Sequence, residues 1–192
     1  MANPRLPPPG LLLVAAFSRH PAALAWARPR LEEHFGPIGL TSAEYAFDQT
    51  SYYAPTMGGG LRKVLWAFDR LLPLDALADA KLAANALERE AAASGEYPDA
   101  RPLNLDPGTL VLGKFLLATT KDQAHRIYLR DGIFAEVTLQ FRAGTFAPWP
   151  WTYADYRLPE VIAFLNLARA HYRQRLASAD ESYSRGEGPH PS

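Results

Sequence analysis

Cysteine is absent from the 192 residues of the sequence. This absence excludes a disulfide framework, a thiolate nucleophile and a zinc site with cysteine ligands. It is compatible with a reducing compartment, so a cytoplasmic location is expected.

An excess of either charge is also missing, because 20 Lys and Arg residues balance 20 Asp and Glu residues. Nucleic-acid binding needs clustered Lys and Arg, so this balance disfavours nucleic acid as a partner.

Long apolar runs are missing as well. No run reaches the roughly 18 residues that a membrane-spanning helix needs, so no membrane partner is expected. The apolar segment Leu11–Phe17 follows three prolines and precedes Ser18-Arg19-His20 rather than a small-residue cleavage signature. We interpret it as a buried strand and not as a signal peptide.

The length and composition fit one globular domain. Apolar residues make up 48% of the chain and charged residues 21%, which is ordinary for such a domain. A chain of this size buries about 70% of its unfolded surface, so it folds without a disulfide or a metal. We predict a disordered proline-rich segment over residues 1–9, a single domain over residues 10–177 and a disordered polar tail over residues 178–192.

Apolar periodicity and turn residues predict the secondary structure. The first six expected elements are strands over residues 10–18, 38–47, 61–71 and 103–105, and helices over residues 21–35 and 73–94. Pro29 lies inside the first helix and is expected to kink or split it. Residues 109–118 fit either a helix or a strand, and the sequence leaves this open.

A β-hairpin over residues 125–142 and an amphipathic helix over residues 159–176 complete the expected fold. The first six elements follow the βαββαβ order of the ferredoxin-like fold. The predicted class is therefore α+β, with a ferredoxin-like βαββαβ order, a mostly antiparallel sheet, and the hairpin and a C-terminal helix as extensions.

The hairpin turns around Arg130-Asp131-Gly132, and its register can be predicted. A plain two-residue turn would set Arg126 opposite Val137 and bury a charge against an apolar side chain. A three-residue loop with Gly132 in the left-handed conformation sets Arg126 opposite Glu136 and separates polar from apolar positions. We prefer this second register, which predicts an ion pair between Arg126 and Glu136.

Several short segments of the sequence are weak motifs one by one, but their combination is specific. In the second half they are residues 104–108, 118–122, 125–129, 132–133, 135–139 and 148–153, and in the first half Phe35–Ile38, Asp48, Tyr52–Tyr53 and Met57–Gly58. With them the sequence resembles a bacterial family of unknown function, the domain-of-unknown-function family 4416, from about Leu11 to Tyr172. The resemblance implies a bacterial protein and brings no established activity. Some members of that family carry a loose GTP-binding label, which the residues can test.

A nucleotide-binding loop has one near match in the sequence. Gly108–Lys114 fits the pattern G-x-x-x-x-G-K, but Phe115 stands where Ser or Thr must bind Mg²⁺. The interior Thr-Leu-Val-Leu is typical of packed structure and not of a loop that curls around phosphates. Thr120-Lys121-Asp122 approaches the guanine-reading pattern but lacks its spacer residue. The sequence therefore disfavours a phosphate loop.

Candidate catalytic residues are His125 and Glu136. As a general base, His125 would need a carboxylate to orient it, and Asp122 or Glu136 could do so. The alternative is a structural histidine that bonds a backbone carbonyl. No metal site is predicted, because no His-x-His or H-E-x-x-H spacing occurs. The sequence leaves open whether a cofactor is used or a reaction is catalysed.

Candidate ligand-binding residues include three cations, Lys114, Lys121 and Arg126, which could hold a phosphate or a carboxylate. The alternative is solvated lysines and an Arg126–Glu136 ion pair. The whole candidate set is Asp106, Lys114, Thr119, Lys121, Asp122, Arg126, Tyr53 and Trp151. The expected function is binding of an anionic metabolite or a nucleotide. The alternative is a protein-interaction module that uses the aromatic loop Trp149–Tyr156 and an exposed strand edge, and the oligomeric state stays open.

Overall fold

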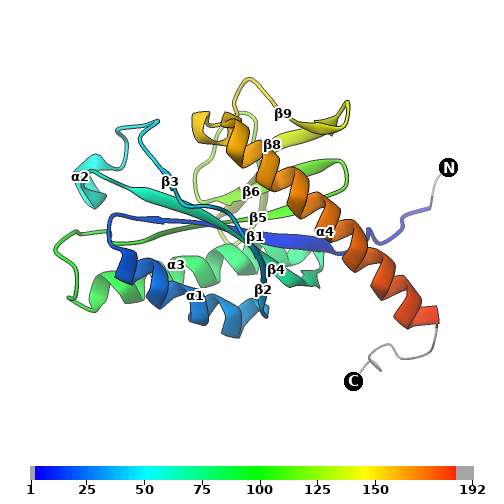
Figure 1. Ribbon diagram of the computed structural model, residues 1–192, viewed down its shortest axis with the longest axis horizontal. Helices are drawn as coiled ribbons and strands as arrows, with labels where there is room; N and C mark the ends of the chain where they lie inside the picture. Colours follow the sequence, from blue (N-terminus) through cyan, green and yellow to red (C-terminus); the bar gives the residue numbers. More distant parts are fainter. Residues whose placement is uncertain (1–2, 185–192) are drawn as a thin grey trace.

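The computed structural model describes residues 3–184 of the chain. In this part nine strands form one sheet, in the order β2-β4-β1-β5-β6-β8-β7, while β3 also pairs with β4 and β9 with β8 (Figure 1). The strands are β1 (Gly10–Ser18), β2 (Ile38–Thr41), β3 (Tyr45–Ala46), β4 (Arg62–Leu72), β5 (Asn104–Val111), β6 (Lys114–Thr119), β7 (Ile127–Arg130), β8 (Ile133–Arg142) and β9 (Thr145–Pro148). The helices are α1 (Pro21–Phe35), α2 (Ala54–Met57), α3 (Leu77–Ala93) and α4 (Pro159–Ser184), with 3₁₀ turns η1 (Leu74–Ala76) and η2 (Ala154–Arg157). The α+β class and the mostly antiparallel sheet are confirmed.

Helices cover both faces of the sheet. Figure 1 shows α1 and α3 side by side on one face and α4 running across the other. Strand β1 is buried along its whole length, as its continuous apolar run predicts. Val14 packs with the α1 and α3 side, and its neighbour Leu13 packs with the α4 side. Because successive side chains of a strand point to opposite faces, β1 joins the two cores.

Helix α1 is continuous through Pro29, so the expected split was wrong. A proline inside a helix removes one hydrogen bond and costs about 3 kcal/mol. Here Ala27 and Leu31, on either side of Pro29, are fully buried in the core beneath the sheet. Burial of this face stabilises the helix across the missing donor.

Residues 109–118, for which the sequence left two possibilities, belong to two strands. Strands β5 and β6 pair from Gly108 with Leu117 to Val111 with Lys114, and Leu112–Gly113 forms the turn. The short strand expected at residues 103–105 is the first part of β5. The expected strand over residues 38–47 is divided into β2 and β3, which both pair with β4.

The hairpin has the predicted register but a different turn. Ile127 pairs with Ala135, which leaves Arg126 beside Glu136, as predicted. The turn is nevertheless a two-residue turn, because Asp131 and Gly132 both have positive φ, 52° and 75°. A register shift between Tyr128 and Arg130 compensates for the missing loop residue.

Helix α4 continues beyond its predicted end at Leu176 to Ser184, so residues 178–184 of the predicted disordered tail are helical. Residues 185–192 of that tail, and residues 1–2, lie outside the described part of the chain. Residues 3–9 have no regular secondary structure. None of the helices found in residues 3–184 combines the length and the apolar character that a membrane span requires.

Candidate functional site

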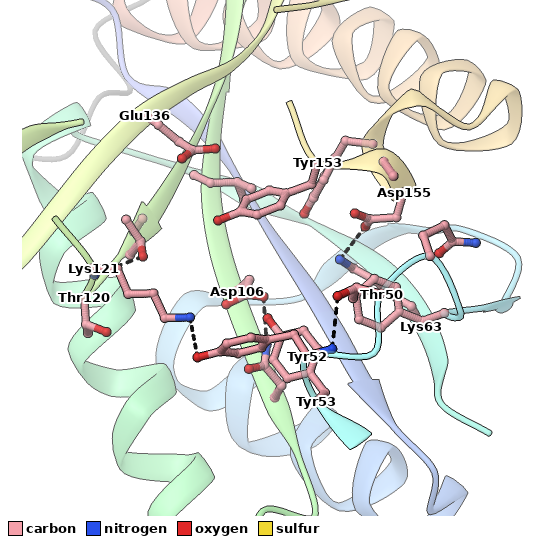
Figure 2. Close-up of a pocket in the computed structure, with 18 of the residues that line it drawn as sticks. Thr50, Tyr52, Tyr53, Lys63, Asp106, Thr120, Lys121, Glu136, Tyr153 and Asp155 are labelled. Atoms are coloured by element: carbon pink, nitrogen blue, oxygen red, sulfur yellow. Dashed lines mark hydrogen bonds and ion pairs between the residues drawn. The ribbon is translucent and has the colours of Figure 1, made fainter. Parts of the chain in front are cut away.

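A cavity of about 420 Å³ opens beside η2, on the face of the sheet that α4 covers. Side chains of β4, β5, β6 and β8 line it, together with the loops before α2 and after β6 (Figure 2). The pairing of β5 with β6 ends at Gly108 and Leu117, so Asn104 and Asp106 of β5 are not paired with β6. Lys81 of α3, a helix that packs on the opposite face of the sheet, also lines the cavity.

One wall of the cavity holds a buried ion pair. The Lys63 Nζ atom lies 2.7 Å from Asp155 Oδ2, and both side chains are almost inaccessible to solvent. The rings of Phe47 and Tyr156 each lie 4.7 Å from this ammonium. Burying a charge is costly unless it is paired, so Asp155 of η2 and Lys63 of β4 hold each other in place.

A second ion pair forms the floor between β5 and α3. Lys81 donates hydrogen bonds to the Leu105 carbonyl at 2.8 Å and to Asp106 Oδ1 at 3.0 Å. Asn104 Nδ2 donates to Asp106 Oδ2 at 2.7 Å. Burial acts to raise the pKa of Asp106, but the charges of Lys81 and Lys63 and these hydrogen bonds outweigh it and lower the pKa. Asp106 therefore presents an ionised carboxylate to the cavity.

The third charged group combines Glu136, Arg126 and His125. Glu136 Oε2 accepts hydrogen bonds from Arg126 Nε at 2.9 Å and from His125 Nε2 at 3.1 Å. Arg126 also donates to the Lys121 carbonyl and to the Tyr153 hydroxyl. The buried Glu136 faces the cavity, whereas His125 is half-buried and stacks on Trp151, with 5.4 Å between ring centroids.

The mouth of the cavity is formed by two loops. Lys121, in the loop after β6, donates to the hydroxyl of Tyr52, in the loop before α2, at 2.7 Å. Figure 2 shows this contact between the two loops. That hydrogen bond, followed by the charge of Lys121, lowers the pKa of Tyr52. Tyr53 lies deeper, and burial raises its pKa. The mouth therefore carries Lys121, Tyr52 and the hydroxyls of Thr119 and Thr120, with Tyr53 below them.

A comparison with models of protein families identifies the family of the chain. The model described as "Domain of unknown function (DUF4416)" matches residues 8–172. The chain belongs to this family. The match confirms the resemblance seen in the sequence, and every residue that lines the cavity falls within the matched span. No curated protein and no solved structure matches this DUF4416 chain.

Five of the predicted site residues of this DUF4416 protein line the cavity. They are Tyr53, Asp106, Thr119, Lys121 and Glu136. Two others, Arg126 and His125, contact Glu136 from behind, and Trp151 stacks on His125. The remaining two do not contribute to its lining. Asp122 is exposed beside the mouth, and Lys114 is exposed at the opposite end of β6.

The segment of this DUF4416 protein that nearly matches a phosphate loop is a β-hairpin, which agrees with the sequence-based prediction against such a loop. Gly108 and Lys114 belong to β5 and β6, and only Leu112 and Gly113 turn between them. A side chain at Gly108 would meet the carbonyl oxygen of Leu116 and the Phe115 ring. The backbone N–H groups of this segment are committed to the sheet, so they do not form a cradle for phosphates.

Sequence reasoning missed several residues that line the DUF4416 cavity, notably Lys63, Lys81, Asn104 and Asp155. Two of these residues, Lys63 and Lys81, could have been recognised from the sequence pattern. Lys63 shares its strand face with Leu65 and Ala67, and Lys81 lies on the apolar face of α3 with Leu77 and Ala84. A lysine on an otherwise buried face requires a partner, and that requirement indicates a polar site. Within residues 3–184, no group of three or more His, Cys, Asp or Glu side chains is placed to hold a metal ion.

Proposed function

We propose that this protein binds a small anionic metabolite or a nucleotide in the cavity, and that Lys121 holds the anionic group. One observation carries the proposal. Four cationic side chains line the cavity, and three of them pair with a carboxylate: Lys63 with Asp155, Lys81 with Asp106 and Arg101 with Glu88. Lys121 has no carboxylate partner among residues 3–184, so its charge is available to a ligand.

The surroundings of Lys121 support this assignment. Thr119 and Thr120 precede Lys121 in the chain, also line the cavity and offer hydroxyl donors to a ligand. The ring of Tyr52 is exposed at the opening, where it can cover a flat or ring-shaped group, and the ring of Tyr53 lies deeper against Phe17 and Phe47. The volume of about 420 Å³ falls in the range of small-molecule sites, roughly 300–1,000 Å³.

The other two predicted cations have different roles in this proposal. All three nitrogen atoms of the Arg126 guanidinium already donate, to Glu136, to the Lys121 carbonyl and to the Tyr153 hydroxyl. Arg126 therefore builds the wall behind the cavity. Lys114 is remote from the cavity and serves as a matched control for Lys121.

A reaction in this cavity would use Glu136 and His125 to move a proton. Glu136 lines the cavity, and His125 connects it to the surface through the 3.1 Å hydrogen bond. A carboxylate and an imidazole in contact can pass a proton between a ligand and solvent. Incubation of each bound compound with the protein, followed by mass analysis of the products, tests for such a reaction.

The test of binding is a thermal-shift screen with nucleotides, sugar phosphates and small carboxylates. A ligand at about 100 times its dissociation constant adds about 2.7 kcal/mol to the free energy of unfolding. Lys121→Ala should reduce the shift given by an anionic hit, and Lys114→Ala should leave it unchanged. A hit that is equally strong in wild type and Lys121→Ala would overturn the assignment of Lys121.

We propose further that β1, α1, β2, β4, α3 and β5 form a ferredoxin-like unit. The spatial order β2-β4-β1-β5 and the position of α1 and α3 on one face support this. An experimental structure in which β4 paired directly with β5 would contradict it. A bacterial origin, implied by the resemblance to the family, and a cytoplasmic location, inferred from the lack of cysteine, complete the proposal.

A second candidate function is a protein-interaction module. The observation that favours it is the edge strand β7, where Ile127 and Tyr128 are 71% and 57% exposed. An exposed apolar edge strand can pair with a strand of another chain. Trp151, also exposed, stacks on the half-buried His125 just before β7. A complex or dimer lost in Trp151→Ala and Ile127→Lys, measured by light scattering, would support this function. A monomer in both wild type and variants would contradict self-association.

A further inference from the structure

We infer that the inner part of the cavity recognises hydroxyl groups, so that its ligand is a phosphorylated sugar or polyol. The inference rests on the proposed function, because it names the class of ligand that the same cavity takes. Lys121 would hold the phosphate at the mouth, and the hydroxyl groups would lie against the inner wall. The ribose phosphate part of a nucleotide offers the same chemistry, and the experiment below separates the two sources.

Two residues that line the cavity, Tyr156 and Gln49, carry the inference, because each has a buried polar atom without a partner among residues 3–184. The Tyr156 hydroxyl and the Gln49 side-chain oxygen are buried and have no hydrogen-bond partner in the described part of the chain. The Tyr156 side chain is only 2% exposed. Gln49 uses its amide nitrogen to donate to Asp48 at 2.6 Å, and its side-chain oxygen remains an acceptor unused by the described residues. Buried polar groups are almost always hydrogen-bonded, so a ligand is expected to supply these partners.

The inner wall also mixes donors with acceptors. Asp106 is an ionised acceptor at the floor, and Gln49 adds a second acceptor. The Lys63 ammonium has three N–H groups and makes a single hydrogen bond to residues of the described chain, the bond to Asp155. A hydroxyl group donates and accepts at once, so several hydroxyls on one molecule can satisfy such a wall.

The charges on the wall disfavour two other kinds of ligand. An ammonium group beside Asp106 would stand next to Lys81, whose Nζ atom is 3.0 Å from that carboxylate, and would be repelled. A second anionic group at the inner end would meet the carboxylates of Asp106, Asp155 and Glu136. A neutral hydroxylated group avoids both penalties, and a single anionic group remains at the mouth.

Calorimetric titration of the full-length protein tests this with four probes: ribose 5-phosphate, glucose 6-phosphate, guanosine monophosphate and methyl phosphate, which has no hydroxyl group. The sugar phosphates should bind at least tenfold more tightly than methyl phosphate, the ratio expected for two or more added hydrogen bonds. Tighter binding of the guanosine nucleotide than of ribose 5-phosphate would point to a base site and overturn the free sugar phosphate as the ligand.

The two possible failures are distinguishable. Equal affinity for methyl phosphate and the sugar phosphates would overturn this inference and leave the anion site intact. If no phosphate probe binds, or if Lys121→Ala binds them as well as wild type, the proposed function fails and this inference falls with it.

A pair of tyrosine variants isolates the hydroxyl contact. Tyr156→Phe should retain or gain folding stability, because the hydroxyl has no partner in the described chain. Its affinity for the tightest sugar phosphate should fall about fivefold, as for one lost hydrogen bond, with methyl phosphate unaffected. Tyr45→Phe is the control, since its hydroxyl is also buried without a partner there but Tyr45 does not line the cavity. Equal sugar-phosphate affinity in wild type and both variants would overturn the inference.

Discussion

The Lys63 ammonium donates a hydrogen bond to the Asp155 carboxylate at 2.7 Å, across 92 residues of sequence. The pair joins β4 to η2 and is almost inaccessible to solvent, with side chains 3% and 4% exposed. The Phe17 ring, 5.3 Å from the ammonium, adds to the aromatic surroundings of Phe47 and Tyr156. Without water to solvate either charge, each residue depends on the other.

Removal of Lys63 should therefore destabilise the fold strongly. Lys63→Met leaves the Asp155 carboxylate buried without its partner, and the free energy of unfolding should fall by about 3–5 kcal/mol. The double variant Lys63→Met/Asp155→Leu removes both charges and should recover most of this loss. Urea unfolding of the three proteins measures both effects.

The neighbouring residue Arg62 provides the control. It pairs with Glu44 at 3.8 Å, but the two side chains are 48% and 52% exposed. Exposed ion pairs contribute about 1 kcal/mol or less, so Arg62→Met should have little effect on unfolding. Similar losses for Arg62→Met and Lys63→Met would mean that burial of the Lys63–Asp155 pair is not what makes it important.

Asp106 should contribute to the loss of stability in acid. Its pKa in the folded protein is lowered, against the effect of burial, mainly by the charges of Lys81 and Lys63. A lowered carboxyl pKa gives stability that is present above the ordinary value of about 3.9 and is lost as pH falls through the folded value. Asp106→Asn should therefore be less stable at pH 7 and should lose less on acidification, measured by urea unfolding between pH 2 and pH 7. Parallel curves for the two proteins would contradict this.

Glu88 should have the opposite effect to Asp106 on the free energy of unfolding in acid. Burial is the largest influence on this carboxyl group and raises its pKa, although Lys81 and Arg101 act against it. A raised carboxyl pKa means that the folded protein binds the proton more tightly, so protonation of Glu88 adds stability as pH falls through the folded pKa. Glu88→Gln should steepen the acid loss that Asp106→Asn flattens. The same pH series of unfolding curves tests both, and a change in the same direction for the two variants would contradict the assignment.

The contact across the mouth should be visible in the titration of Tyr52. The hydrogen bond from Lys121 lowers the pKa of this exposed phenol. Lys121→Met should raise the pKa of Tyr52 towards its ordinary value near 10, while Lys114→Met should leave it unchanged. The difference in ultraviolet absorbance between each protein and its Tyr52→Phe counterpart isolates this one tyrosine among the nine in the chain. No change in Lys121→Met would show that the contact does not persist in solution.

The Arg126–Glu136 pair could be predicted from the sequence because the information is local. Strand side chains alternate between faces, so a hairpin has few registers, and only one placed both charges together. The structure has that pair at 2.9 Å. The type of turn was harder to predict, because two turns give the same pairing of Ile127 with Ala135. One is a two-residue turn with a register shift in β7, and the other is a three-residue loop.

The cavity as a whole could not be predicted in this way. Lys63, Lys81 and Asp155 come from a strand, a helix and a 3₁₀ turn that are distant in sequence. Their meeting depends on the strand order and on the place where β5 and β6 stop pairing, and neither is encoded by local periodicity. The lysines were detectable as charges on apolar faces, but their partners were not.

The hairpin between β5 and β6 provides a last prediction, which separates a structural glycine from a nucleotide-binding one. A methyl group at Gly108 would meet the Leu116 carbonyl oxygen and the Phe115 ring, whereas nothing lies within 4 Å of one at Gly113. Gly108→Ala should therefore lower the free energy of unfolding by about 1–3 kcal/mol through overpacking, and Gly113→Ala should change it little. In a phosphate loop both glycines would instead be needed for the backbone to approach phosphate, so both variants would weaken GTP binding with little effect on stability. Urea unfolding and a GTP titration of the two variants distinguish these outcomes, and the packing of Gly108 in the sheet predicts the first.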